Sequence, residues 1–477
     1  MARPYLYRAN RTAARISLYA SLVAAGAISL ALLVLVVIPG SRYVQDLGWV
    51  PQDYERFEEV RLFADFLRID TSPDTGNEVE GATFLASVLA EEGIESEILT
   101  MGDRRANLIA RLPGRSREAL ILHNHIDVEP ILTPERWAYD PFGGEIDMPW
   151  MYGRGAFDMK SVTIAQLFAI LQLKRSGVVP ARDIVFLATS GEEMGSELGT
   201  RWLLEERPEL FDEAWGLITE GGVVEARSPD DVKYWGTEVG QKRYVKVLAC
   251  SPSKARLEDL RTDIRDEDFN QRDLRVHPSV ASFLDHYGPS RDSPTHRRQL
   301  ARPAAVFDDP ELFNRFAGYH RALFRNEISP FPVQEAADGS GYELAIMIAL
   351  PPGYELEPAL ELLPEWMTHG VHLVVMADRG SSAASRLDHP ILETINQLVL
   401  EAFGDVDVGP YYQMSSATDA RFFREAGIAS YGFSPFLVLT TDTIGIGGPN
   451  EGIALPAFAH GVQLYVDLLE RLVNEAE

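Results

Sequence analysis

Side chains that commonly bind metal ions follow a series of hydrophobic runs in the first half of this chain. The runs cover residues 119–122, 184–188 and 215–218, and each is typical of a buried parallel strand. Ligands of open α/β sheets bind at the carboxyl ends of such strands, so we expect the following side chains to meet at one edge. They are His125 and Asp127, Asp158, the pair Glu192 and Glu193, and Glu220. One imidazole and several carboxylates suit a cluster of two divalent ions, with zinc favoured.

Such a cluster would make water a nucleophile at neutral pH, so hydrolysis is the reaction class that this pattern favours. Glu192 and Glu193 follow a buried run and Gly191, so one could bind metal while the other takes a proton from water. The alternative is a solvated helix face. His125 and Asp127 share one side of an extended segment, where the carboxylate can brace the imidazole. The alternatives are local capping of His125 and turn capping by Asp158.

The alternation of strand and helix patterns up to Glu220 predicts a doubly wound α/β fold. From Tyr234 the pattern changes, and residues 266–302 are rich in arginine and look irregular. Around this stretch we expect strands over 241–249, 342–350 and 372–376, and helices over 255–265 and 356–367. We therefore predict a mostly parallel catalytic domain over residues 46–235 and 384–477, interrupted by a smaller α+β lid domain over residues 236–383.

The N-terminal segment, residues 1–45, contains an apolar run over residues 16–38. Four arginines precede the run (Arg3, Arg8, Arg11 and Arg15), and the first acidic residue is Asp46. A run of roughly 20 apolar residues can span a bilayer, and the positive charges would keep the N-terminus in the cytoplasm. We expect a single-pass anchor, with the catalytic domain on the periplasmic or extracellular side. A cleaved signal peptide is the alternative.

The charge and the cysteine content exclude several classes of partner and site. A formal net charge of −27 argues against a nucleic-acid partner, which requires a basic face. Cys250 is the single cysteine, so an intrachain disulfide and a thiolate zinc site are both excluded.

The ordered motifs resemble the M20 family of metallopeptidases, which includes carboxypeptidases, aminoacylases and deacylases. The anchored N-terminus is most similar to the carboxypeptidase S-like branch. The matching strings are His125-Ile-Asp127-Val-Glu-Pro130, Trp137 with Asp140-Pro141-Phe142, Tyr152-Gly-Arg-Gly-Ala-Phe-Asp158-Met-Lys160, Ser190-Gly-Glu192-Glu193, Thr219-Glu220-Gly-Gly222 and Ala417-Thr-Asp419-Ala-Arg421-Phe422.

This resemblance implies a metal-dependent hydrolase that cleaves an amide bond of a peptide or N-acyl amino acid with a free carboxylate. Asp158 would bridge two zinc ions, His125 and Glu220 would bind one of them, and Glu193 would bind the other. Glu192 would be the general base, and Asp127 would orient His125. Arg421 would hold the substrate carboxylate, with a surface arginine as the alternative. The family often forms dimers through the lid, which implies a homodimer.

Three strings depart from the family pattern. Gly447 stands where the family has its last histidine ligand, so the chain could hold one ion, or Asp442 or His460 could replace the imidazole. In the lid, Cys250-Ser-Pro-Ser-Lys254 replaces a string whose histidine helps to stabilise the oxyanion, and residues 349–353 are altered as well. Loss of an oxyanion donor typically costs about 10²–10³ in rate. Either the substrate differs or the chain is a catalytically impaired binding module.

Overall fold

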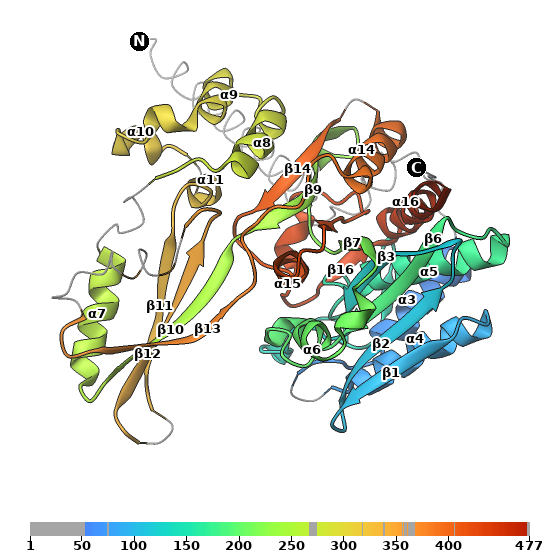
Figure 1. Ribbon diagram of the computed structural model, residues 1–477, viewed down its shortest axis with the longest axis horizontal. Helices are drawn as coiled ribbons and strands as arrows, with labels where there is room; N and C mark the ends of the chain where they lie inside the picture. Colours follow the sequence, from blue (N-terminus) through green and yellow to red (C-terminus); the bar gives the residue numbers. More distant parts are fainter. Residues whose placement is uncertain are drawn as a thin grey trace, which may run out of the picture.

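A computed structural model describes residues 53–474, apart from 74–75, 267–273, 317, 337–338, 355, 357–359, 361–367 and 405. Within these residues the largest sheet has nine strands, in the order β1-β2-β6-β3-β7-β15-β9-β14, with β8 paired to β9 (Figure 1). The strands are β1 (Ser96–Met101), β2 (Arg105–Leu112), β3 (Ser116–His125), β6 (Arg182–Thr189), β7 (Ala214–Thr219), β8 (Val223–Ser228), β9 (Asp231–Gln241), β14 (Asp407–Gln413) and β15 (Ser430–Gly432). The α/β class of the prediction is confirmed.

The large sheet is mixed, which corrects the expectation of a mostly parallel one. The pairs β3–β6, β3–β7, β7–β15 and β9–β14 are parallel. The pairs β1–β2, β2–β6, β9–β15 and β8–β9 are antiparallel. The β1–β2 pair follows from a short turn in which Gly102 has a φ of 70°, because strands joined by so short a connection must run in opposite directions.

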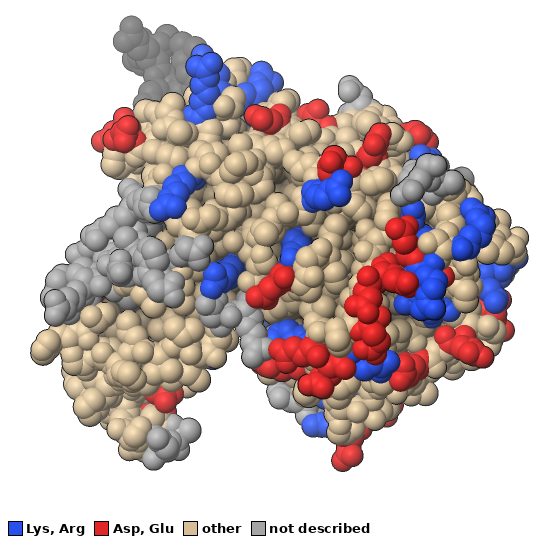
Figure 2. All heavy atoms as spheres, viewed as in Figure 1, with Lys and Arg blue, Asp and Glu red and all other residues tan. Residues whose placement is uncertain are grey.

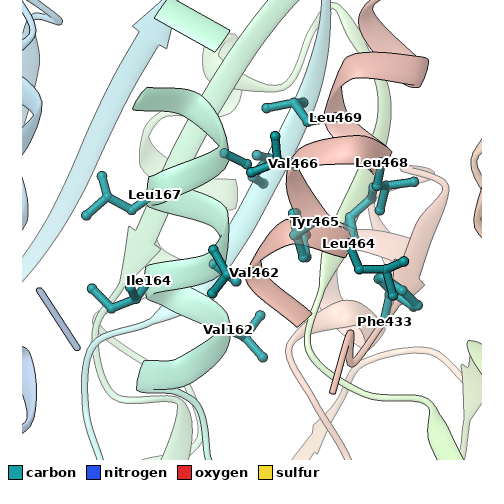
Figure 3. Close-up of a cluster of buried hydrophobic side chains, with 14 of the residues drawn as sticks. Val162, Ile164, Leu167, Phe433, Val462, Leu464, Tyr465, Val466, Leu468 and Leu469 are labelled. Carbon is teal, nitrogen blue, oxygen red and sulfur yellow. The ribbon is translucent and has the colours of Figure 1, made fainter. Parts of the chain in front are cut away.

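Both faces of the large sheet are covered, as expected of a doubly wound fold. In β3, Leu120 and Leu122 pack into one apolar core, whereas Ala119 and Ile121 pack into another on the opposite face. Figure 3 shows part of the first core, where Val162 and Ile164 of α5 lie beside Val462 of α16. Burial of each such leucine or isoleucine contributes about 1.5–3 kcal/mol. The rigid central strands therefore fix the positions of the residues that follow them.

Different helices cover the two faces of the large sheet. The first core includes residues of α3 (Glu58–Leu67), α4 (Glu78–Glu91), α5 (Lys160–Ser176), α14 (Pro390–Phe403) and α16 (Leu455–Asn474), and the second includes residues of α6 (Thr200–Glu206) and α15 (Ala420–Glu425). Shorter elements are β4 (Glu145–Asp147), β5 (Trp150–Tyr152) and β16 (Gly452–Ala454), which form a small sheet, and the 3₁₀ turns η1 (Tyr54–Arg56), η2 (Pro134–Arg136), η3 (Glu192–Met194), η4 (Pro208–Leu210) and η7 (Asp442–Gly445).

A second sheet lies between β9 and α14 in the chain and forms a separate lobe (Figure 1). Its antiparallel order is β11-β12-β10-β13. The bounds are β10 (Arg243–Ser251), β11 (Glu327–Glu335), β12 (Tyr342–Leu350) and β13 (His372–Arg379), and α7 (Lys254–Asp266) packs on one face. These elements lie close to the strands and the first helix expected there, whereas most of the helix expected over residues 356–367 lies outside the described residues.

The arginine-rich stretch, which we expected to be irregular, contains helices. They are α8 (Pro278–Tyr287), α9 (Pro294–Ala301), η6 (Pro303–Val306), α10 (Pro310–Phe313) and α11 (Gly318–Ala322). In α8, the apolar residues Val280, Phe283, Leu284 and Tyr287 recur at helical spacing and are buried against β9 and β14. This helical segment therefore packs on the edge of the large sheet, away from the second sheet's own core.

The prediction of a membrane-spanning helix is corrected. None of the helices in the described ranges is long and apolar enough to cross a bilayer. The longest, α16, has 20 residues but is amphipathic, with Asp467, Glu470 and Arg471 among them. Residues 16–38, on which the expected anchor and the membrane-anchored location rested, lie outside the described residues.

Candidate metal centre

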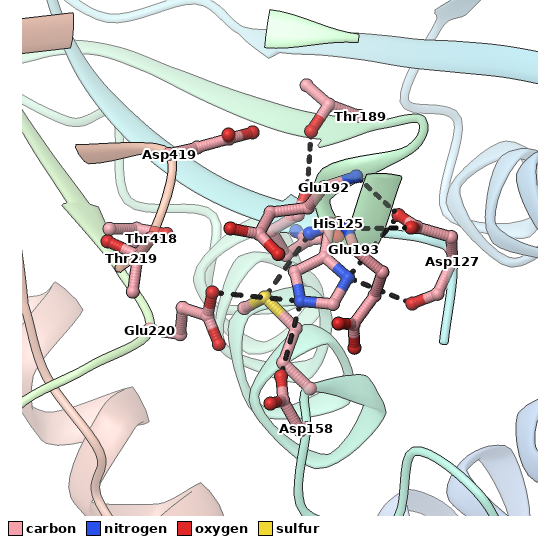
Figure 4. Close-up of polar contacts among 12 residues, drawn as sticks. His125, Asp127, Asp158, Thr189, Glu192, Glu193, Thr219, Glu220, Thr418 and Asp419 are labelled. Atoms are coloured by element: carbon pink, nitrogen blue, oxygen red, sulfur yellow. Dashed lines mark hydrogen bonds and ion pairs between the residues drawn. The ribbon is translucent and has the colours of Figure 1, made fainter. Parts of the chain in front are cut away.

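The predicted ligands come from adjacent parallel strands and meet at their carboxyl ends (Figure 4). His125 is the last residue of β3, and Glu220 directly follows β7. After β6 the chain turns at Gly191, whose φ of 70° favours glycine, and enters η3 with Glu192 and Glu193. Asp158 comes from the loop that leads into α5. Three neighbouring strands and one helix thus bring these side chains to one place.

The ligand atoms form two groups that share His125. Its Nε2 lies 3.3 Å from Oδ1 of Asp158 and 3.7 Å from Oε1 of Glu220. One group is His125, Glu192 and Glu220, the other is His125, Asp158 and Glu193, and within each group the ligand atoms lie within 4.8 Å of one another. Glu192 thus lies beside Glu220, and Glu193 lies beside Asp158. The separation of the two glutamates agrees with different roles for adjacent residues of one turn.

Asp127 holds the turn that carries both glutamates. Its two carboxylate oxygens each accept a hydrogen bond of 3.0 Å, one from the backbone N–H of Glu192 and one from that of Glu193. The imidazole Nδ1 of His125 instead donates to the backbone carbonyl of Asp127 at 2.8 Å, while the carboxylate lies 3.5 Å away. A carbonyl oxygen can only accept, so Nε2 is the nitrogen left to face Asp158 and Glu220.

A buried ion pair fixes the loop that carries Asp158. One carboxylate oxygen of Glu451 accepts hydrogen bonds from the backbone N–H groups of Phe157 (2.9 Å) and Asp158 (3.1 Å). The other accepts from Nη1 of Arg154 at 2.6 Å, and Nη2 of Arg154 donates to the carbonyl of Gly447 at 2.9 Å. We did not predict these roles. The signal in the sequence was that Glu451 ends the altered string Ile446-Gly447-Gly-Pro-Asn-Glu451.

A second buried network ties the strand ends together beneath the ligands. His123 is completely buried, and its ring nitrogens contact the hydroxyls of Thr219 (2.8 Å) and Thr189 (3.0 Å). Burial lowers the pKa of His123 to about 3, so its ring is neutral. Asp419 accepts a hydrogen bond from the Thr200 hydroxyl at 2.6 Å and one from Ser196. This network joins β3, β6 and β7 to α6 and to the residue before α15. It was not predicted, although His123 lies two residues before His125 on the same face of β3.

The acidic groups shift one another's pKa values. Burial, with the charges of Asp158, Asp127 and Glu129, raises the pKa of Glu193 to about 9. Burial and the charge of Asp158 raise the pKa of Glu220 to about 7, and burial raises that of Glu192 well above its usual range. Burial also opposes ionisation of Asp158, but the hydrogen bond and charge of His125 outweigh it and lower the pKa of Asp158. Carboxylates in this arrangement require positive charge to ionise together.

Several observations show that this donor set fits divalent ions. Oε1 of Glu193 is buried without a hydrogen-bond partner among the described residues. Burial lowers the pKa of His125, yet Glu220, Asp127 and Asp158 together raise it well above 6.5. A proton on Nε2 therefore occupies a position where a metal ion would satisfy the same carboxylates. One imidazole with oxygen ligands is a set that zinc, cobalt and manganese accept.

Four of the acidic residues, Asp158, Glu192, Glu193 and Glu220, line a cavity with a volume of about 1120 Å³. This is slightly above the usual range for small-molecule sites. Its walls come from β8, β14 and the loop between α8 and α9, where Ser290 and Arg291 line the cavity. Arg291 pairs with Glu225 of β8 at 2.6 Å, so the helical segment contributes a wall that the sequence did not predict.

Arg421 lies outside the residues that line this cavity in the described part of the chain. Its Nη1 donates to the carbonyl of Thr418 at 3.1 Å, and its guanidinium lies 4.4 Å from the ring centre of Phe422. Its side chain also packs against Gly380, where a Cβ atom would come within 2.7 Å of it. Burial raises the pKa of Glu192, and the positive charge of Arg421 partly opposes that rise, so Arg421 is close to the centre without lining the cavity.

The chain is similar to known enzymes over different lengths. A probable succinyl-diaminopimelate desuccinylase of Staphylococcus epidermidis is 33% identical over 161 residues, which are 34% of this chain and only 38% of that relative. Aminoacylase-1A of Rattus norvegicus is 24% identical over 433 residues, covering 87% of this chain and 95% of its own.

Solved structures share the fold, and a family model covers most of the chain. The metallo-carboxypeptidase Sso-CP2 of Sulfolobus solfataricus superposes with a TM-score of 0.67 at 17% identity, covering 87% of this chain and 99% of its own. Human carnosine dipeptidase 1 gives 0.64 at 15% identity, covering 89% and 97%. The model of peptidase family M20/M25/M40 matches residues 121–471, so the predicted resemblance is confirmed and the chain belongs to this family.

Proposed function

We propose that this chain is a zinc-dependent hydrolase that cleaves an amide bond in a peptide or N-acyl amino acid with a free carboxylate. One observation carries the proposal: Glu192 lies in the same group as His125 and Glu220, and it lines a cavity large enough for such a substrate. Membership of the peptidase family supports the hydrolase class, and the similarity to Aminoacylase-1A along 87% of the chain supports an amide substrate.

The residues that would hold zinc are His125, Asp158, Glu193 and Glu220. Bound zinc would lower the pKa of a water molecule and polarise the scissile carbonyl. Asp127 holds the Glu192–Glu193 turn through its two backbone hydrogen bonds, so the relative positions of base and ligand are fixed before substrate binds. A preorganised arrangement of this kind lowers the cost of reaching the transition state.

Glu192 would act as the general base. It takes a proton from water while the water oxygen adds to the carbonyl carbon, and it gives that proton to the amine nitrogen as the C–N bond breaks. The products are a carboxylic acid and an amine, so the atoms of one water molecule are accounted for. Burial raises the pKa of Glu192, which brings its proton affinity closer to that required near neutral pH.

The substrate carboxylate requires a cation, and Arg421 remains the proposed partner. Two basic residues that line the cavity already form ion pairs. Arg291 pairs with Glu225 at 2.6 Å, and Lys233 pairs with Asp231 at 2.7 Å. The charge of Arg421 reaches Glu192 from the side of Thr418, which does line the cavity. The homodimer through the lid stays a prediction.

The test compares the wild-type chain with Glu192→Gln on a panel of N-acetyl amino acids and dipeptides after zinc loading. We expect wild-type hydrolysis, and a fall in kcat of about 10²–10⁴-fold in the variant. The zinc content should stay near the wild-type value, because Glu192 acts as the base. Glu197→Gln is the matched control, since Glu197 is on the same loop with 66% of its side chain exposed, and it should keep wild-type activity.

A wild-type chain that binds zinc but hydrolyses no member of the panel would contradict the proposal and favour the binding module. A Glu192→Gln variant with wild-type kcat would contradict the role of Glu192 while leaving the reaction class intact.

A further inference from the structure

The position of Gly447 shows what lies where the family's last histidine ligand would project. Gly447 has a φ of 68°, and the hydrogen bond from Arg154 to its carbonyl ties it to the loop of Asp158. A Cβ atom built on Gly447 would lie 2.9 Å from Oε2 of Glu129 and 3.4 Å from its Cδ. The direction that a side chain at position 447 would take is therefore filled by the carboxylate of Glu129.

Glu129 is placed to act at the metal centre. It follows Asp127 by two residues in the segment after β3, and it lines the same cavity as Asp158 and Glu193. No hydrogen bond or ion pair holds its carboxylate among the residues that the structure describes. The carboxylate oxygens of Glu129 are therefore available to bind an ion on the side of the centre where the family histidine would lie.

The two substitutes that the sequence suggested are engaged elsewhere. Asp442 accepts hydrogen bonds from the backbone N–H of Leu439 (3.2 Å) and the hydroxyl of Thr441 (3.4 Å). His460 lies in α16, where its ring packs 5.3 Å from that of Phe403. Neither residue belongs to the described lining of the cavity.

We propose that Glu129 replaces the family histidine as a ligand of the second ion, beside Asp158 and Glu193. This inference rests on the proposed function for the presence of the ions. In the structure Glu129 is outside both groups of ligand atoms within 4.8 Å, so its side chain must turn toward Glu193 when the ion binds. A carboxylate is an ordinary ligand of zinc and of manganese, and the exchange of imidazole for carboxylate adds one negative charge and favours harder ions.

The experiment measures zinc per full-length chain by mass spectrometry, and zinc affinity by calorimetry, for the wild type and Glu129→Gln. We expect about two ions in the wild type. In the variant, the affinity for the second ion should fall at least about tenfold, because loss of even an indirect partner typically costs 10–100-fold. Glu135→Gln, at an exposed glutamate of η2, removes the same charge and should change neither value.

Several outcomes separate the alternatives. Equal second-ion affinity in wild type and Glu129→Gln would overturn the inference, and so would a single ion of equal affinity in both. Equal thermal unfolding of the two metal-free proteins shows that the variant folds. Two ions that depend on Glu129, in a wild-type chain without hydrolysis, would support the ligand and contradict the proposed function. No zinc in the wild type would overturn both.

Discussion

The two sheets of this molecule differ in what their strand ends carry. In the large sheet, parallel strands end in His125, in the turn of Glu192 and in Glu220, and buried networks beneath them fix their positions. In the second sheet, the end of β10 leads through Ser251 into α7, and the Ser251 hydroxyl donates to the carbonyl of Gly370. Figure 2 shows acidic and basic side chains interspersed over the lobe of the large sheet.

This contrast indicates which residues a metal centre would constrain. A metal centre requires fixed distances among its carboxylates and imidazole, and the candidate ligands at the strand ends of the large sheet meet that requirement. The second sheet departs from the family string at Cys250–Lys254, and large apolar side chains such as Val375 and Met376 of β13 are exposed there. We infer that the candidate metal centre and the second sheet are separable. Two of the three predictions below test this separation, and the third tests the electrostatics of the centre.

The largest effect on stability is expected for the buried ion pair between Arg154 and Glu451, in the lobe of the large sheet. Arg154 and Glu451 are 3% and 1% exposed, so Glu451→Gln would leave a buried arginine without its carboxylate. We expect a loss of about 3–5 kcal/mol in the free energy of unfolding, measured by urea denaturation, with a lower zinc content. Glu258→Gln in α7 breaks a partly exposed ion pair with Arg261 beside the second sheet, whose side chains are 42% and 24% exposed, and should cost less than about 1 kcal/mol. Equal losses in the two variants would contradict the separation.

The sequence predicted the features that depend on neighbouring residues, but not the contacts between residues far apart in the chain. The positions of His125, Glu192, Glu193 and Glu220 could be predicted because each lies at or just after the carboxyl end of β3, β6 or β7, so local pattern and parallel order were sufficient. The contact from Glu451 to Asp158 joins residues 293 apart in sequence, and no local pattern predicts such a pairing. The sequence shows that glycine replaces the family histidine at position 447. The proximity of Glu129 to Gly447 can be seen only in the folded structure.

The helical segment that begins with α8 carries a helix-start signal in its sequence. In α8, Pro278 is the first helical residue, and the side chain of His277 accepts a hydrogen bond from the backbone N–H of Ser279. We predicted an irregular segment because it is rich in arginine, and we gave less weight to this helix-start signal and to the apolar spacing after it.

A medium effect is expected for stability as a function of pH. The pKa of Glu193 is raised to about 9 and that of Glu220 to about 7, from ordinary values near 4.5, so the folded metal-free protein binds these protons more tightly than the unfolded chain does. Their stabilising contribution is complete below pH 4.5 and is lost as the pH rises through 7 toward 9. We therefore expect the Tm of the metal-free protein to fall from pH 5 to pH 9 in scanning calorimetry.

Zinc should remove most of that fall, because the ions stabilise the ionised carboxylates. Glu193→Gln should reduce the fall, leaving the part due to Glu220, whereas Glu197→Gln should leave the profile as in the wild type. A metal-free Tm that rises over this range would show that the cluster does not disfavour ionisation.

The smallest effect is expected in the altered lid string. Lys254 is exposed at the start of α7, so Lys254→Ala should change kcat/KM by less than about twofold and leave the zinc content unchanged. Steady-state kinetics on the best substrate of the panel measures it. A tenfold loss would mean that the lid string takes part in the reaction, and the two sheets would then not be separable.

We infer that the strand ends of the large sheet hold two metal ions around Asp158. Anomalous diffraction at the zinc absorption edge, from crystals of the full chain grown with zinc, tests it most directly. We predict two peaks, one beside His125 and Glu220 and the other beside Glu193 and Glu129, with Asp158 between them. Peaks absent from these strand ends, or found only elsewhere on the molecule, would contradict the account.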